Sequence, residues 1–434
     1  MEIRHFNDLG YKLTTVKSDK FKTNLISFTF HSEIKRENVT KRSLIPYILR
    51  SSTKEYPTKK LFNTALENLY GASLSANVEK KGKAHNIKFY LSLPNEAFLP
   101  GNEPLMEAGI SLVKEMLLNP LAENGAFDAQ VVETEKRLLA EYIESLYDDK
   151  TSYALQKLME NMCRGEAYAV HSTGYVEDLE MIDPVNLYAE YEQLLRKDAL
   201  EIAVVGDVCP ETVYELFKKH FRLKTPAKSG DIQDFEEKPL KVVEVVTEAQ
   251  DVSQGKLNIG YRTYTRISDE DYLSLLVFNG IFGAYAHSKL FMNVREKSSL
   301  CYYCASRLDN FKGLMYVYSG IEFQNYEQAL AIIDEQLDDM KRGNFTEKEM
   351  DLAKKSLINS KLESLDQATG LLAHENLNDL LREAMTVEEW VAAINSVTQE
   401  QIIATANKIQ KDTIFFLTGK KAGIPLERSE ISAG

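Results

Sequence analysis

The feature that most constrains the fold of this chain is an internal repeat. Each half begins with alternating apolar and polar residues that predict a strand, at residues 24–30 and again at residues 257–261. Each half also ends with Lys-Asp and a continuous apolar run that predicts a buried strand, at residues 197–205 and 411–417. Because the chain has 434 residues, two cores are more natural than one, and the repeat predicts two homologous α/β domains.

The elements between these ends also keep the same order in both halves. A helix running into a strand is predicted at residues 66–74 and at residues 294–302, and a further strand at residues 86–91 and 314–318. The repeat therefore extends through both halves, and the predicted fold class is α+β.

A change in composition predicts the boundary between the two domains. Residues 224–238 are polar and are interrupted by proline and glycine, as is typical of a linker. We therefore expect an N-terminal domain at residues 1–226, a linker at residues 227–238 and a C-terminal domain at residues 239–434.

Composition argues against several classes of partner. The formal net charge of −13 and the pI of about 5.3 disfavour nucleic acid and anionic membrane surfaces. The longest apolar run, residues 275–286, is too short to span a bilayer, and the first residues show no secretory signal. The four cysteines do not suggest a disulfide framework, so we expect a cytoplasmic protein without membrane insertion.

Residues 40–74 are informative because of the residues that they lack. They contain Ser52-Thr53 and then Tyr56-Pro57-Thr58, followed by a helix. This pattern resembles the first helices of the pitrilysin/insulinase-like zinc peptidases, where an inverted H-x-x-E-H motif precedes Gly-Thr and Tyr-Pro-Ser/Thr. No histidine occurs between His31 and His85, so the zinc motif itself is missing.

Alignment on these residues shows how the metal site is lost. Ser43 and Tyr47 stand where the family has its two zinc-binding histidines, and Pro46 stands in place of the glutamate. Serine and tyrosine are poor zinc ligands, and proline offers no side-chain base. Because proline also lacks a backbone N–H, we expect this helix to begin near Ser43 or to be kinked there.

The third zinc ligand of the family is also replaced. Residues 135–143 resemble the downstream helix that carries a zinc-binding glutamate, and Tyr142 stands at the ligand position. Leu138, Tyr142 and Leu146 are four residues apart, so packing of Tyr142 is favoured over a role as a plug in the abandoned pocket. The resemblance implies that this chain binds no zinc, and it leaves the role of Glu141 open.

A second segment retains the family pattern. Residues 295–302 match R-E-K-x-G-L-x-Y, except that Ser299 stands in place of glycine. By composition alone a solvated helix end is favoured. In the family, however, this arginine and tyrosine reach across to a peptide held at the zinc. The resemblance therefore implies that Arg295 and Tyr302 support substrate binding and the transition state across a dimer.

Cys301 and Cys304 form a C-x-x-C pattern in the same segment. Residues i and i+3 of a regular strand point to opposite faces, and no second C-x-x-C completes a zinc site. The sequence therefore disfavours a redox or metal-binding role for this pair.

The resemblance spans nearly the whole chain and implies two α/β-roll domains that form half of a clamshell chamber. We expect a non-catalytic subunit of a heterodimeric zinc metallopeptidase, inactive alone, whose H-x-x-E-H paralogue holds the zinc and whose substrate is a peptide or leader peptide. The alternative is a homodimeric peptide-binding or scaffold protein of the same fold. An active hydrolase with a relocated metal site is least favoured, because no His/His or His/Glu pair has ligand spacing.

Overall fold

The computed structural model describes residues 2–101, 103–223, 240, 242–381, 383–420 and 428–432. The predicted linker, residues 227–238, lies outside the described residues. The chain divides into two compact units by its internal contacts. The first unit takes in the described residues of Met1–Ser145, Val170–Gln233 and Leu365–His374, and the second takes in those of Leu146–Ala169, Asp234–Ser364 and Glu375–Gly434.

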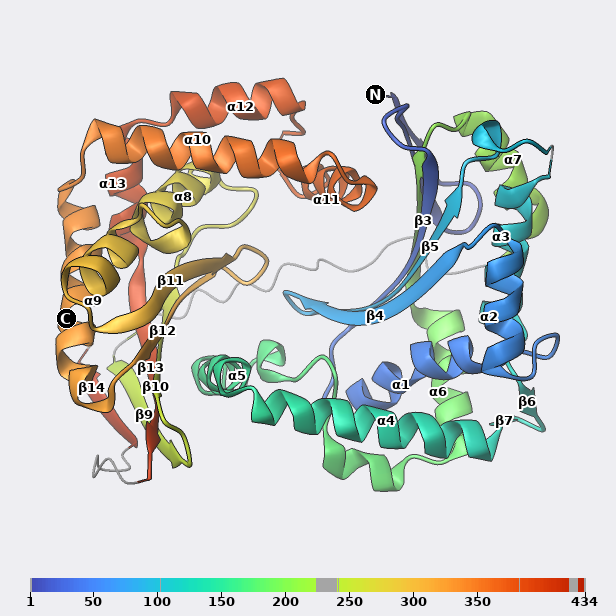
Figure 1. The fold of residues 1–434 in the computed structure, drawn as a ribbon, viewed down its shortest axis with the longest axis horizontal. Helices are drawn as coiled ribbons and strands as arrows, with labels where there is room; N and C mark the ends of the chain where they lie inside the picture. The colour runs from blue at the N-terminus through green and yellow to red at the C-terminus, as the bar shows by residue number, and fades with distance from the viewer. Residues whose placement is uncertain are drawn as a thin grey trace. The chain divides into compact units, whose positions relative to one another are not determined.

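The first unit is built on a six-stranded sheet in the order β1-β2-β8-β3-β5-β4. Its strands β3, β4 and β5 are labelled in Figure 1. Strands β2 and β8 are parallel, and the other neighbouring pairs are antiparallel. The strands are β1 (Glu2–Phe6), β2 (Lys12–Lys17), β3 (Thr23–Glu33), β4 (Ser73–Lys81), β5 (Ala84–Pro94) and β8 (Ala199–Gly206). A two-stranded ribbon is formed by β6 (Ala122–Glu123) and β7 (Ala126–Phe127).

The helices between these strands cover one apolar core with the sheet. The α-helices are α1 (Val39–Ser51), α2 (Lys59–Asn68), α3 (Leu105–Leu118), α4 (Ala129–Asp148), α6 (Pro184–Lys197) and α7 (Pro210–His220). Short 3₁₀ helices are η1 (Glu96–Phe98) and η3 (Val176–Met181). Strand β3 is central, and seven successive residues from Asn24 to Phe30 are buried, because helices and neighbouring strands cover it.

The second unit contains another six-stranded sheet, in the order β11-β12-β10-β13-β9-β14 (Figure 1). Strands β9 and β13 are parallel, and the other neighbouring pairs are antiparallel. The strands are β9 (Val242–Gln250), β10 (Gly255–Arg262), β11 (Cys301–Asp309), β12 (Leu314–Ile321), β13 (Gln410–Gly419) and β14 (Arg428–Ser432).

The helical elements of the second unit include two π-helical turns. The α-helices are α5 (Lys150–Met162), α8 (Tyr272–Asn279), α9 (Tyr326–Arg342), α10 (Glu347–Ser364), α12 (Val387–Ser396) and α13 (Gln399–Lys408). The π-helical turns are η4 (Gly280–Ala284) and η5 (Phe291–Lys297), and the 3₁₀ helices are η2 (Ala167–Ala169) and η6 (Phe323–Asn325). Helix α11 (Ala368–Asn378) contributes residues to both units.

The two sheets confirm the duplication predicted from the sequence. Read from the opposite edge, the second sheet runs β14-β9-β13-β10-β12-β11, and each inner strand occupies the place of its counterpart in the first sheet. The parallel pair β2–β8 corresponds to the parallel pair β9–β13. The outermost strand differs in origin, because β1 precedes the repeat whereas β14 follows it. The predicted α+β class with two homologous halves is therefore correct.

Helix α5 groups with the second sheet although it precedes the predicted linker. It packs against β10 and β13, where Leu158 joins a buried cluster with Phe415 and Leu417. At the end of α5 the buried Arg262 donates to Glu166 at 2.8 Å and to Asp412 at 2.8 Å. The second unit therefore includes residues 146–169, which the predicted boundary at residue 226 assigned to the N-terminal domain.

Helix α1 corrects one expectation about its start. It begins at Val39 rather than near Ser43, and Pro46 lies inside it. An interior proline costs about 3 kcal/mol, because it removes a backbone hydrogen bond and crowds the preceding turn. The turn before Ser43 is nevertheless helical and buried. Val39, Thr40 and Arg42 are buried, and the Arg42 backbone N–H donates to the Asn38 carbonyl oxygen at 2.9 Å.

None of the helices among the described residues is both long enough and apolar enough to cross a membrane.

Candidate functional site

Ser43, at the position of the first lost zinc ligand, is buried and engaged by the backbone. Its hydroxyl is fully buried and lies 2.9 Å from the carbonyl oxygen of Val39 and 2.7 Å from that of Ser172. The first contact lies within α1, and the second fastens the segment around residue 172 to the helix. Ser43 therefore has a structural part, and its oxygen is committed to hydrogen bonds within the unit.

A buried histidine also contacts the segment around residue 172. His85 Nε2 lies 2.8 Å from the carbonyl oxygen of Ser172, and the Arg42 guanidinium donates to His85 Nδ1 at 3.1 Å. Burial, followed by the charge of Arg42, lowers the pKa of His85 to about 3, so the ring is neutral at pH 7. A neutral ring protonated at Nε2 satisfies both contacts. Arg42 also donates to Asp198 at 2.7 Å, which completes the network.

The two tyrosines at the other lost ligand positions lie on α1 and α4. Tyr47 is partly buried, and its pKa is raised by burial and further by Tyr142 and Glu135. Tyr142 is 48% exposed, and Leu138 on the same stripe is also exposed. The predicted packing of Tyr142 into a core is therefore wrong for this structure. The α4 face that packs inward instead carries Val132, Glu135 and Leu139.

Arg50 is a charged neighbour of Tyr47 that the sequence analysis did not identify. It lies three residues after Tyr47, so both side chains extend from one face of α1. Burial lowers the pKa of Arg50, whereas Tyr47 and Glu135 oppose that effect. Glu135 is itself buried and accepts a hydrogen bond from Ser51 at 2.6 Å. The i, i+3 spacing from Tyr47 was the available signal for Arg50.

The residues present at these positions do not fit a zinc ion. The Ser43 hydroxyl is occupied by carbonyl oxygens, and Tyr47 keeps its proton at neutral pH because its pKa is raised. Zinc requires deprotonated thiolate or carboxylate ligands, or neutral imidazole. Across the described ranges, no group of three or more His, Cys, Asp or Glu side chains could hold a metal ion.

Arg295 lies in the second unit on the π-helical turn η5. Its side chain is 42% exposed, its guanidinium carbon lies 4.6 Å from the centre of the Phe291 ring, and its Nε lies 3.7 Å from a Glu296 carboxylate oxygen. The Arg295 guanidinium therefore lies over an aromatic ring, and its N–H donors remain accessible. π-Helical turns are rare and are frequent at functional sites.

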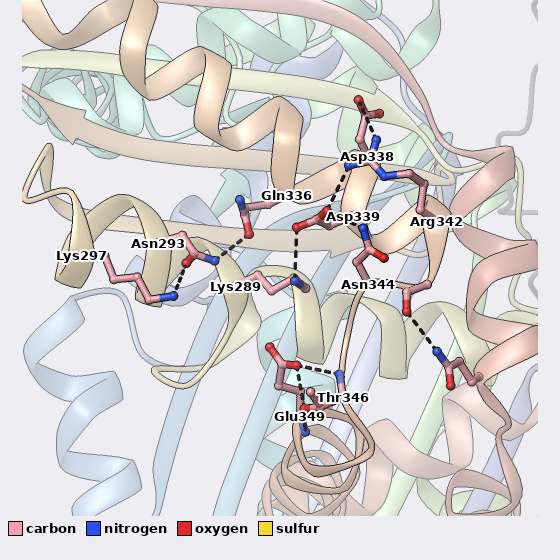
Figure 2. Close-up of polar contacts among 12 residues, drawn as sticks. Lys289, Asn293, Lys297, Gln336, Asp338, Asp339, Arg342, Asn344, Thr346 and Glu349 are labelled. Carbon is pink, nitrogen blue, oxygen red and sulfur yellow. Dashed lines mark hydrogen bonds and ion pairs between the residues drawn. The ribbon is translucent and has the colours of Figure 1, made fainter.

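Polar contacts fix the turn that carries Arg295 to helix α9 (Figure 2). Asn293 donates to the buried Gln336 at 2.6 Å, and Lys289 lies 3.6 Å from Asp339. Lys297 in turn donates to Asn293 at 2.9 Å. We interpret the contacts of Asn293 and Lys289 with α9 as positioning contacts, because they hold the segment that carries Arg295 against that helix.

Tyr302 lies at the start of β11, which is an edge strand of its sheet. The pairing with β12 shifts between Cys301 and Tyr303, so Tyr302 is the extra residue of a β-bulge. The side chain is 70% exposed. Bulges re-aim side chains at sheet edges, and here the bulge presents a phenol to solvent.

Comparison with known proteins shows which family this arrangement belongs to. The family model described as "Peptidase M16 inactive domain" matches residues 182–357. "Probable inactive metalloprotease YmfF" from Bacillus subtilis (strain 168) is 42% identical over 410 residues, covering 94% of this chain and 96% of that protein. The chain belongs to the M16 peptidase family. It is an inactive, pitrilysin-like member of short form.

The chain is also similar to a further curated protein and to solved structures. "Uncharacterized zinc protease YmxG", also from Bacillus subtilis (strain 168), is 24% identical over 66% of this chain and 69% of that protein. The crystal structure of a conserved protein from Enterococcus faecalis V583 has a TM-score of 0.91 at 33% identity, covering 97% of this chain and 99% of that one. A "peptidase M16 inactive domain" from Pseudomonas fluorescens shares the fold, with a TM-score of 0.77 at 18% identity and coverage of 98% and 100%.

Ser299 marks a departure from the M16 pattern that the backbone explains. Its φ is +52°, in the left-handed region that favours glycine, and the family has glycine at this position. The backbone at Ser299 therefore has a conformation that glycine adopts readily, which is compatible with the resemblance of residues 295–302 to the family pattern.

Replacing Ser299 with glycine should stabilise the second unit by about 1 kcal/mol. A non-glycine residue in the left-handed region costs about 1–2 kcal/mol, and glycine relieves this strain. Part of the gain is lost, because glycine also increases the conformational entropy of the unfolded chain. The expected rise in Tm is about 2–4 °C. Ser298→Gly is the matched control, since φ at Ser298 is −95° and glycine gains nothing there. Calorimetry that shows equal effects for both variants would contradict the strain argument.

Proposed function

We propose that this chain is the non-catalytic subunit of a two-chain zinc metallopeptidase. It would complete the chamber of an H-x-x-E-H paralogue and supply Arg295 and Tyr302 to the peptide held there. The observation that carries the proposal is the contrast between the two units. The metal positions have become serine, proline and tyrosine, whereas the substrate-side pair remains exposed on fixed elements.

The chemistry of the retained pair suits peptide hydrolysis. Negative charge develops on the peptide carbonyl oxygen as the bond is attacked, and a positioned donor there stabilises the transition state more than the substrate. The Tyr302 hydroxyl can donate to that oxygen, and the Arg295 fork can hold neighbouring carbonyls. Neither group can activate water by itself, so the proposal requires a partner that holds zinc and a base.

The relatives offer partners of the required kind. The YmfF and YmxG proteins occur together in Bacillus subtilis (strain 168), and their names describe an inactive metalloprotease and a zinc protease. One organism therefore encodes both a member of the inactive kind and a member named as a zinc protease. By analogy, we infer a paralogue with an intact motif in the source of this chain, and a peptide or leader peptide as the substrate.

Co-expression with such a paralogue tests the proposal. Native mass determination should give a 1:1 complex, and metal analysis should find about one zinc per complex, carried by the paralogue. This chain alone should cleave no peptide, whereas the complex should cleave it. Full activity of the paralogue without this chain would contradict the proposal. A stable homodimer that never exchanges with the paralogue would favour a scaffold protein instead.

A further inference from the structure

The bulge at Tyr302 has a second effect, on the cysteines beside it. Cys301 pairs with Ile321 of β12, and Cys304 pairs with Ser319. Residues that pair directly in an antiparallel ladder project on the same face, and residues two apart on one strand also share a face. Ile321 and Ser319 share a face, so Cys301 and Cys304 share it as well. The expectation of opposite faces is wrong, because the bulge adds one residue to β11.

The two thiols are neighbours with unequal surroundings. Cys304 is 1% exposed, whereas Cys301 is partly exposed. The interaction with the Cys304 thiol lowers the pKa of Cys301, and the charge of Arg295 lowers it further against the opposing effect of burial. The interaction with Cys301 and burial raise the pKa of Cys304. Cys301, which is also the more exposed thiol, is therefore the better nucleophile of the pair.

We propose that Cys301 and Cys304 form a reversible thiol–disulfide pair, with Cys301 as the attacking thiol and Cys304 as the resolving thiol. Two cysteines on one face of an edge strand, one partly exposed and one buried, have the arrangement of a redox-sensitive site. In the sheet formed by the described residues, β11 pairs only with β12, so the strand can adjust when the bond closes.

The reaction requires an oxidant, for which we name a low-molecular-weight disulfide. The Cys301 thiolate attacks one sulfur of that disulfide, and one thiol leaves, giving a mixed disulfide on Cys301. Cys304 then loses its proton and attacks the Cys301 sulfur, and the second thiol leaves. Two electrons pass from the cysteine pair to the oxidant, so one disulfide forms in the protein and one disulfide is reduced to two thiols.

The bond would close across the bulge that presents Tyr302. Cys301 and Cys304 bracket Tyr302 and Tyr303, so a covalent link restricts the backbone that aims the Tyr302 phenol. It also removes the ionisable Cys301 thiol, whose pKa the charge of Arg295 helps to lower. This consequence rests on the proposed function, whereas the thiol chemistry does not. Oxidation is expected to change turnover of the complex through Tyr302 and Arg295.

The thiol chemistry can be tested on the full chain alone. After treatment with oxidised glutathione, mass spectrometry of peptides should show a Cys301–Cys304 disulfide that dithiothreitol reverses. Cys304→Ser should instead retain glutathione on Cys301, and Cys301→Ser should leave Cys304 unmodified. Cys209 is the internal control, since it is exposed and lies 3.4 Å from Glu211. It should carry only a slow mixed disulfide.

Two results would overturn the pairing. Wild-type protein that accumulates stable glutathione on Cys301 without closing the bond would exclude Cys304 as the resolving thiol. Modification of Cys209 before Cys301 would exclude an activated Cys301. Arg295→Ala should slow the modification of Cys301 several-fold, because the neighbouring positive charge is lost. An unchanged rate would remove Arg295 from the proposed site.

A second measurement separates this proposal from the proposed function. Turnover of the assembled complex should change on oxidation for the wild type and stay constant for the Cys301→Ser, Cys304→Ser double variant. If the disulfide forms but turnover is unchanged, the pair is a redox site without a regulatory effect on this complex. If no complex forms, the proposed function is wrong. The thiol chemistry is then decided by the glutathione experiment on the isolated chain.

Discussion

Tyr302→Phe is expected to lower the turnover of the assembled complex by about 10²-fold, the effect of removing one oxyanion donor. The substitution keeps the ring and removes only the hydroxyl. Because Tyr302 is 70% exposed on an edge strand, its loss should not disturb the fold or the assembly. Steady-state kinetics on the purified complex, with its mass confirmed, would measure the effect. An unchanged rate would limit this subunit to forming a wall of the chamber.

A neighbouring residue supplies the matched control. Tyr303 is partly buried on the same strand, and its hydroxyl lies 3.4 Å from that of Thr151, so Tyr303→Phe should leave turnover within about twofold.

Arg295→Ala should raise KM and lower kcat, because Arg295 is proposed to hold the peptide as well as the reacting carbonyl. Arg295→Lys should not restore activity, since the planar fork is lost.

The fold could be predicted from the sequence because its signals are periodic and occur twice. The strands at residues 24–30 and 257–261 correspond to β3 and β10, and the paired Lys-Asp runs lead into β8 and β13. The place of α5 could not be predicted, because it depends on which sheet its apolar face covers. No local pattern in residues 150–162 distinguishes the two sheets, whose strands have similar composition.

The sequence-based account of the site rests on residue identity and missed features that depend on geometry. The inferred losses at Ser43, Pro46, Tyr47 and Tyr142 rest on the residue types alone and stay predictions. A start of α1 near Ser43 was wrong, because the preceding turn, which contains Val39, Thr40 and Arg42, is helical and buried. The faces of Cys301 and Cys304 were wrong because period-2 reasoning fails at a bulge.

One retrospective signal pointed to the turn before β11. Ser299 stands at a family glycine, and family glycines often mark left-handed backbone. The π-helical geometry of η5, by contrast, has no sequence pattern that single-residue reasoning would detect. The exposure of Tyr142 likewise depends on which face of α4 meets the core, and both faces carry leucines.

Arg262→Met is expected to destabilise the second unit by about 3 kcal/mol, because it removes the arginine partner of the buried Asp412 and one of the two cationic partners of Glu166. Arg262 donates to Glu166 and Asp412, and Lys312, which is fully buried, lies 2.5 Å from Glu166. Urea unfolding followed by tryptophan fluorescence would measure the loss. Trp390 is the only tryptophan of the sequence and is buried in the second unit, so the signal reports on that unit.

Arg137→Met is the control for a lost arginine in an exposed ion pair. Arg137 lies 2.7 Å from Glu141 with both side chains more than half exposed, so the cost should stay below about 0.5 kcal/mol. A similar loss in both variants would show that the buried network contributes no more than a surface pair. The comparison therefore separates burial of the carboxylates from the removal of an arginine as such.

The pH dependence of the Arg262→Met effect provides a second, independent check. Burial alone would raise the pKa of Glu166, but hydrogen bonds and charge from Arg262 and Lys312 more than offset this, so the pKa is lowered. A lowered carboxyl pKa contributes stability above the unfolded pKa of about 4.3, and this contribution is lost as pH falls through the folded pKa. In the Arg262→Met variant the pKa of Glu166 is lowered less, so the variant loses less stability in acid than the wild type. The difference in unfolding free energy between wild type and variant should therefore be constant above about pH 5 and narrow as pH falls below about 4.3. A difference that also stays constant in acid would show that lost packing, rather than the unpaired carboxylates, causes the destabilisation.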